Sequence, residues 1–171
     1  MTYETKRKRI QEHVNDTLIH KQCLINSCVK MINCLYDCGR DDDALALAKR
    51  CSLHDHSKLQ TEEIDSFVCL PKEDHDGKPN GILTDEQRKY IEIHWKKNRH
   101  HPEFHDDYHQ MSEIDIIEMV CDWHARSKQF GNVMSLVEFL NDTQMKRFGF
   151  DAELYERILV YCEIFDNLSS L

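Results

Sequence analysis

Glycine, proline and long apolar runs are all scarce in this sequence. Its 171 residues include only 5 Gly and 3 Pro, which favours helices with short connections over a turn-rich β fold. No run of about 18 apolar residues occurs, so no membrane span or membrane partner is expected. Residues 1–9 are charged and lack the apolar centre of a signal peptide. We therefore expect a cytoplasmic protein built mainly from helices.

Several catalytic and metal-binding motifs are also missing. The sequence has no glycine-rich phosphate loop, no Gly-x-Ser-x-Gly elbow and no arrangement of cysteine and histidine typical of a nucleophile. None of its eight cysteines forms a Cys-x-x-Cys pair, and most lie among apolar neighbours. We interpret them as mainly reduced, partly buried thiols, in preference to a disulfide framework or a cysteine zinc site. Any catalysis should therefore be centred on a metal.

Basic residues are fewer than acidic residues in this chain. The 22 basic residues stand against 31 acidic ones, for a formal net charge of −9. An acidic surface of this kind argues against a nucleic-acid partner. It does not exclude a small anionic substrate, because local lysines and arginines can dominate a pocket.

The spacing of apolar residues predicts helices throughout. Leu24, Cys28, Met31 and Leu35 form one stripe at helical spacing, and no alternating pattern indicates a sheet. The turn-rich segment 71–83 is expected to be an exposed loop, with a flap near a site as the alternative. The whole chain, 1–171, is predicted to be a compact all-α single domain of about six or seven helices. Helix-like patterns cover residues 3–15, 17–38, 43–51, 59–70, 84–100, 112–130, 132–147 and 151–168.

An adjacent histidine and aspartate, His54 and Asp55, follow the helical run 43–51. Together they offer an imidazole nitrogen and a carboxylate oxygen, which suit zinc, iron or manganese. On a regular helix their side chains diverge by about 100°, so a shared metal requires a helix end or a local distortion. Upstream, His20 continues the buried stripe, and downstream, Asp122 lies in an apolar helix where an unpaired carboxylate would be costly. The alternatives are a capping aspartate, a satisfied core histidine and a salt-bridged carboxylate.

A second group of histidines lies in the expected helix 84–100 and directly after it. His94 and His101 are seven residues apart, with Asn98 between them on nearly the same face. Seven residues span two turns, roughly 10 Å of rise, which is too far for one ion. This spacing favours two ions, or one ion and a histidine that contacts substrate, with Asn98 or His100 as further substrate contacts. The alternative is an exposed histidine-rich helix without function.

The order His, His-Asp, His, Asp resembles the HD-domain superfamily of metal-dependent phosphohydrolases. The resemblance covers about residues 18–130 and leaves 131–171 as C-terminal helices. Within the superfamily, the sequence is similar to a small uncharacterised HD-like family. The resemblance implies that Asp55 bridges two metals. It also implies two sets of further ligands. The two sets are His20, His54 and Asp122 for one ion, and His94 with His100 or His101 for the other. The segments that carry the resemblance are His20-Lys21, His54-Asp55-His56-Ser57-Lys58, His94–His101 and Asp122-Trp123.

The resemblance implies hydrolysis of a small phosphorylated metabolite or nucleotide by metal-activated water. One or two divalent transition-metal ions, such as iron, manganese or zinc, would be the cofactor. Asp55 and Lys58 are the expected catalytic residues, and the alternatives are a di-iron oxygenase similar to inositol oxygenase or a non-enzymatic metal-binding helical protein. The expected metal ligands are His20, His54, Asp55, His94, His101 and Asp122, and the expected substrate-binding residues are Lys58, Asn98, His100 and Arg126.

Overall fold

The computed structural model describes residues 2–68 and 85–168, and the segment 71–83 expected as a loop lies outside them. Within these ranges the chain forms helices and no strands, which confirms the all-α prediction. A π-helical turn at Leu140–Gln144 joins α6 to α7, so the described residues contain seven continuous helices besides short 3₁₀ turns. The α-helices are α1 (Tyr3–Asp37), α2 (Asp41–Leu53), α3 (Thr61–Val68), α4 (Asp85–Lys97), α5 (Glu113–Phe130), α6 (Leu136–Phe139), α7 (Met145–Phe148) and α8 (Ala152–Leu168).

Helix α1 is longer than the sequence predicted. It runs unbroken for 35 residues, so the expected division into helices 3–15 and 17–38 was wrong. Thr2 caps its start by accepting a hydrogen bond from the Thr5 amide. No glycine or proline occurs before Gly39, which has a φ of 71° and lies at the turn after the helix. The chain between the two expected helices therefore contains no residue that would break α1.

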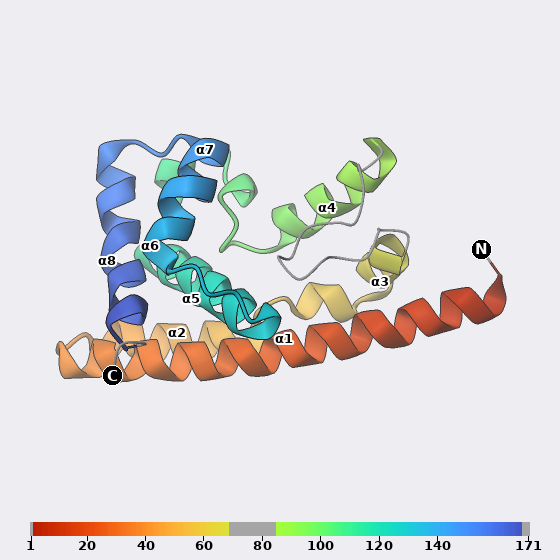
Figure 1. Ribbon diagram of the computed structural model, residues 1–171, viewed down its shortest axis with the longest axis horizontal. Helices are drawn as coiled ribbons and strands as arrows, with labels where there is room; N and C mark the ends of the chain where they lie inside the picture. The colour runs from red at the N-terminus through yellow and green to blue at the C-terminus, as the bar shows by residue number, and fades with distance from the viewer. Residues whose placement is uncertain (1, 69–84, 169–171) are drawn as a thin grey trace.

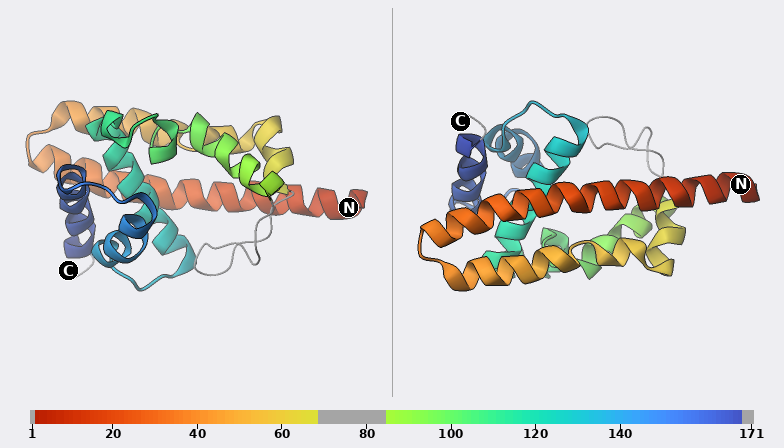
Figure 2. Two further views of the ribbon diagram at one scale, coloured as in Figure 1. Left: turned by 90° about the horizontal axis from the view of Figure 1, so that it is seen from above. Right: turned by 90° about the horizontal axis from the view of Figure 1, so that it is seen from below.

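Helices α1 and α2 form an antiparallel pair, and α5 crosses them (Figure 1; Figure 2). The expected stripe of Leu24, Cys28, Met31 and Leu35 is buried there, with each side chain at most 2% exposed. From α8, a second stripe that includes Ile158 packs into the same core. The helical spacing of apolar residues thus located the core correctly.

Helix α5 carries clear signals at both ends. Ser112 and Asp115 form a capping box at its start, and Gly131 ends it in a left-handed conformation. Ser135 caps α6 in the same way, so the helix expected from 132 begins later, at Leu136. These caps set the bounds of α5, the helix that carries Asp122.

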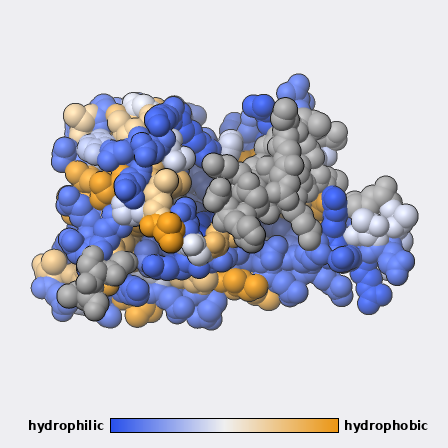
Figure 3. Space-filling view, viewed as in Figure 1, coloured by the Kyte–Doolittle hydropathy of each residue, from blue (hydrophilic) through white to orange (hydrophobic). Residues whose placement is uncertain are grey.

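Among the described helices, none combines the length and apolar character needed to cross a membrane. The seven described cysteines are free thiols, and four of them are buried. On the face shown in Figure 3, apolar residues lie in separate patches, several of them along the lower edge where α1 runs.

Candidate metal centre

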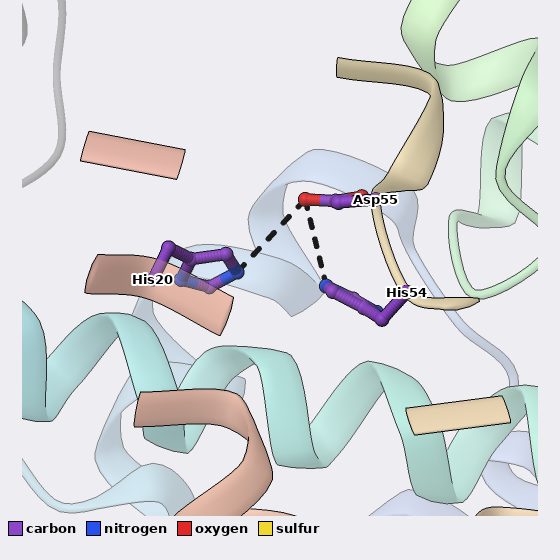
Figure 4. Close-up of side chains that lie close together, drawn as sticks. All are labelled: His20, His54 and Asp55. Atoms are coloured by element: carbon purple, nitrogen blue, oxygen red, sulfur yellow. Dashed lines mark ion pairs between the residues drawn. The ribbon is translucent and has the colours of Figure 1, made fainter. Parts of the chain in front are cut away.

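His54 and Asp55 lie at the point where α2 ends, and the backbone there leaves the helix. His54 has an extended conformation, with φ −50° and ψ 131°, and Asp55 is left-handed, with φ 51° and ψ 23°. Asp55 is the one non-glycine residue with positive φ among those described. This distortion brings the two side chains together, with His54 Nε2 3.5 Å from Asp55 Oδ2 (Figure 4). The helix end that a shared metal requires is therefore present.

His20 and Asp122 reach the same point from α1 and α5. His20 Nε2 is 3.9 Å from Asp55 Oδ2 and 2.8 Å from Asp122 Oδ1, and Asp122 Oδ1 is 3.6 Å from His54 Nε2. The 2.8 Å pair lacks the angles of a hydrogen bond. Ligands of one ion with bonds of about 2.1 Å lie roughly 3 to 3.5 Å apart, close to these separations. The four side chains, far apart in sequence, therefore converge as the sequence predicted.

The histidines after α3 lie closer together than the sequence suggested. The two-turn separation expected for His94 and His101 was wrong, because α4 ends at Lys97 and not near His100. The chain then turns back, which brings His101 Nε2 to 3.1 Å from His94 Nε2. His100, expected as a substrate contact, points its Nε2 toward Asp55 Oδ1 at 3.7 Å.

Asp55 stands between the two groups of histidines. Its Oδ2 faces His20 and His54, at the distances given above, and these contacts are drawn in Figure 4. Its Oδ1 faces His94 Nε2 at 3.4 Å as well as His100. One carboxylate thus presents one oxygen to each group, which is the arrangement that a bridging ligand requires.

Two buried glutamates support the histidines, and the sequence reasoning missed both. Glu118 Oε1 lies 2.9 Å from His54 Nδ1, and Glu63 Oε2 lies 3.0 Å from His94 Nδ1. A carboxylate on Nδ1 fixes the tautomer that leaves Nε2 free to bind a metal. Glu118 could have been found, because it precedes Asp122 by four residues on the same face of α5. Nothing in the sequence distinguishes Glu63 from its neighbour Glu62.

Arg50 of α2 holds this supporting layer in place. Its guanidinium forms ion pairs with Glu118 Oε2, at 2.5 Å, and with Asp115 Oδ1, at 2.9 Å. Asp115 also accepts from Arg99 and from the Ser112 hydroxyl. The carboxylate that positions His54 is therefore itself fixed between α2 and α5.

The residues expected to bind substrate have different surroundings. Lys58 is buried, and its Nζ lies 2.5 Å from Asp55 Oδ2. The Asn98 amide donates to Ser57 Oγ at 2.9 Å and to the His94 carbonyl at 2.8 Å, so it fixes the end of α4. Arg126 lies over the ring of Phe130 and lines a cavity beside the centre. Contact of these side chains with a substrate stays a prediction.

The electrostatics of the metal-free site follow from burying opposite charges together. Burial lowers the pKa of His54, but the surrounding carboxylates, Asp55 foremost, outweigh it and raise the pKa to about 10. Burial raises the pKa of Asp55, but His54 and Lys58 outweigh it and hold the pKa well below its ordinary value. Burial and the charge of His54 lower the pKa of His100 to about 4. A metal that binds His54 must therefore displace a proton.

The donor atoms fit a transition-metal ion. Three overlapping groups of side chains each bring three donor atoms within 4.8 Å of one another. Several of these atoms are buried without a hydrogen-bond partner among the described residues, which is costly unless another ligand satisfies them. Imidazole and carboxylate donors suit zinc, iron and manganese. The groups are His20, His54 and Asp55; His54, His100 and Asp122; and Asp55, His100 and His101.

Comparison with known proteins gives a family but no activity. The model of a family described as "Family of unknown function (DUF5662)" matches residues 9–158. Neither the comparison with curated proteins nor that with solved structures found a match.

Proposed function

We propose that this chain, which belongs to the family of unknown function DUF5662, is a metal-dependent phosphohydrolase acting on a small phosphorylated metabolite or nucleotide. The observation that carries the proposal is the position of Asp55, whose Oδ2 faces His20 and His54 and whose Oδ1 faces His94 and His100. Phosphate ester hydrolysis adds water across the phosphorus–oxygen bond and yields an alcohol and inorganic phosphate. A bound divalent ion supplies a water of lowered pKa and neutralises charge on a phosphoryl oxygen.

The protein side chains orient this centre. His20, His54 and Asp122 would hold one ion with Asp55 Oδ2, while His94 and His100 or His101 would hold a second with Asp55 Oδ1. Glu118 and Glu63 hold Nδ1 of His54 and His94, which aims Nε2 of each ring inward.

Lys58 supplies the positive charge for the substrate. In the metal-free structure its ammonium neutralises Asp55, on the oxygen that faces His20 and His54. A cation on that oxygen would take over this role, which frees the ammonium to bind a phosphate oxygen. Lys58 therefore competes with metal in the empty site and contacts substrate in the loaded one.

Metal reconstitution followed by a panel of phosphate esters tests the proposal. Protein purified without chelators is stripped, reloaded with manganese, iron or zinc, and assayed for release of inorganic phosphate. We expect turnover that requires metal and is lost in Lys58→Gln, which keeps its metal because a competing cation has been removed. Exposed Lys49 gives the matched control, Lys49→Gln. Fully loaded protein that hydrolyses no ester with any of the three metals would overturn the proposal.

An oxygenase is the second candidate, favoured by the number of imidazoles. Five histidines, His20, His54, His94, His100 and His101, lie around the two carboxylates. Histidine-rich sites with carboxylates suit iron as well as zinc. Specific retention of iron, with oxygen consumption and no phosphate release, would favour this function over hydrolysis.

A further inference from the structure

A cavity of about 250 Å³ opens beside the candidate metal centre. His100, His101 and Asp122 of the centre form part of its wall, and the rest comes from α4, the 3₁₀ turn Pro102–Phe104, α5, the segment before α6, and the region of α6 and α7. A molecule in this cavity can therefore reach the centre directly. Its volume lies just below the range of small-ligand sites, about 300–1,000 Å³, so it suits a small molecule and not a polymer.

Much of the cavity wall is aromatic. Trp123 and Phe139 meet edge to face with ring centroids 5.5 Å apart, and three more aromatic side chains complete it. Flat ring faces and edges pack best against another flat ring. The three further side chains are Trp95, Phe130 and Phe148.

Two arginines add positive charge to this aromatic wall. The Arg147 guanidinium lies 4.8 Å from the ring centre of Trp95 and 4.7 Å from that of Phe148, and it pairs with Glu103. Arg126 lies 5.6 Å from the ring centre of Phe130. Cations over rings stay close to the wall and still attract an anion. These two guanidinium groups offset the carboxylates of Glu103 and Asp122 on the same wall, so the cavity can accept a negatively charged ligand although the chain has a net charge of −9.

Glu103 contributes a hydrogen-bond acceptor to the cavity. Its Oε1 pairs with Arg147, but its Oε2 is buried with no hydrogen-bond partner in the described part of the chain. A ligand with an N–H or O–H group on its ring could satisfy this oxygen.

We infer that the substrate is a phosphate monoester whose alcohol part carries a planar ring. This inference rests on the proposed function. The phosphoryl group lies against the metal centre at His101 and Asp122, and the ring lies between the aromatic side chains of the cavity. A carbocyclic ring and a nucleobase share this chemistry. Stacking supplies selectivity against aliphatic esters, which match the charge but leave the aromatic wall unfilled.

Tryptophan fluorescence tests the inference without relying on turnover. The chain has two tryptophans, Trp95 and Trp123, and both line the cavity. Metal-loaded protein is titrated with three non-hydrolysable probes: phenylphosphonate, a nucleoside phosphonate and propylphosphonate. We expect a saturable change with at least one ring-bearing probe, at about tenfold higher affinity than with propylphosphonate. The ring-bearing probe that binds more tightly identifies the kind of ring.

Arg147→Gln supplies the variant, because this partly exposed side chain can be changed without opening the core. It should weaken binding of the tighter ring-bearing probe about fivefold or more at an unchanged melting temperature. Arg157→Gln is the matched control, since Arg157 pairs with Glu113 and does not line the cavity. Equal loss in the two variants would overturn the assignment of Arg147.

The outcomes separate this inference from the proposed function. If the protein hydrolyses aliphatic and ring-bearing esters equally and shows no preference among the probes, the inference of a ring-bearing substrate is wrong. The proposed phosphohydrolase function is then still supported. Protein that binds a ring-bearing probe in the cavity but hydrolyses no phosphate ester supports the cavity and contradicts the phosphohydrolase.

Discussion

Replacing Glu63 by glutamine should weaken metal binding at the His94 side of the centre. Glu63 is fully buried, and its Oε2 lies 3.0 Å from His94 Nδ1. Burial raises the pKa of Glu63, but His94 and the other hydrogen-bond partners outweigh it, so the pKa lies below its ordinary value and the group is ionised at neutral pH. The carboxylate therefore fixes the orientation and the tautomer of the His94 ring.

The magnitude follows from the role of such partners. Loss of a carboxylate behind a coordinating histidine costs about 10- to 100-fold in metal affinity. This corresponds to about 1.4–2.7 kcal/mol. Glutamine can still accept the hydrogen bond from Nδ1. We therefore expect a loss of metal affinity of about 10-fold in Glu63→Gln and of about 100-fold in Glu63→Ala. The side of the centre at His54, supported by Glu118, should keep its affinity.

A competition titration against a metal-binding dye measures this effect. Glu62→Gln is the control, because Glu62 is the adjacent residue, is 79% exposed and pairs with Lys97 at the surface. We expect the affinity of one metal site to fall in the Glu63 variants, and metal binding in Glu62→Gln to equal that of the parent. Parent-like binding by Glu63→Ala, or an equal loss in the Glu62 variant, would refute the supporting role of Glu63.

Two further predictions concern stability. Burial raises the pKa of Asp115, but Ser112, Arg99 and Arg50 outweigh it and hold the pKa below 3.8. The resulting stabilisation is present above that value and lost as the pH falls through the folded pKa. Asp115→Asn should therefore lower the free energy of unfolding by about 2 kcal/mol at neutral pH, and urea titrations should show the difference shrinking in acid; a difference that grows in acid would contradict this. Ile158→Ala removes a fully buried side chain of α8 and should cost about 2–5 kcal/mol by the same titration, with unchanged metal content per folded molecule. Loss of metal from folded Ile158→Ala would show that the core and the centre are not independent.

Regular packing made most of the fold predictable from sequence. Apolar residues at helical spacing identified the buried face of α1, and the expected helix 112–130 matches α5, which Ser112 and Gly131 cap. The division of α1 into 3–15 and 17–38 was wrong, because the helix continues through the polar residues between the two ranges. Polar residues permit a helix start without requiring one, whereas the absence of glycine and proline permits continuation.

The candidate site was predictable where the ligand types are distinctive. The resemblance that His20, His54, Asp55 and Asp122 carry predicted that these side chains converge. The separation of His94 and His101 was not predictable, because it depends on where α4 ends. Pro102 disfavours helix at His101, but the helix ends earlier still, and only the fold shows the return of the chain.

Metal content of the parent protein and Asp55→Asn tests the central claim most directly. Asparagine tolerates the left-handed backbone at this position, and an amide is a poor bridge between two ions, so the change removes the bridge without opposing the local fold. Both proteins are purified without chelators and compared by elemental analysis and circular dichroism, with exposed Asp41→Asn as the control. We predict one or two divalent transition-metal ions in the parent and the control, and loss of metal from a helical Asp55→Asn protein. A parent with no stoichiometric metal, or full occupancy in Asp55→Asn, would contradict the account.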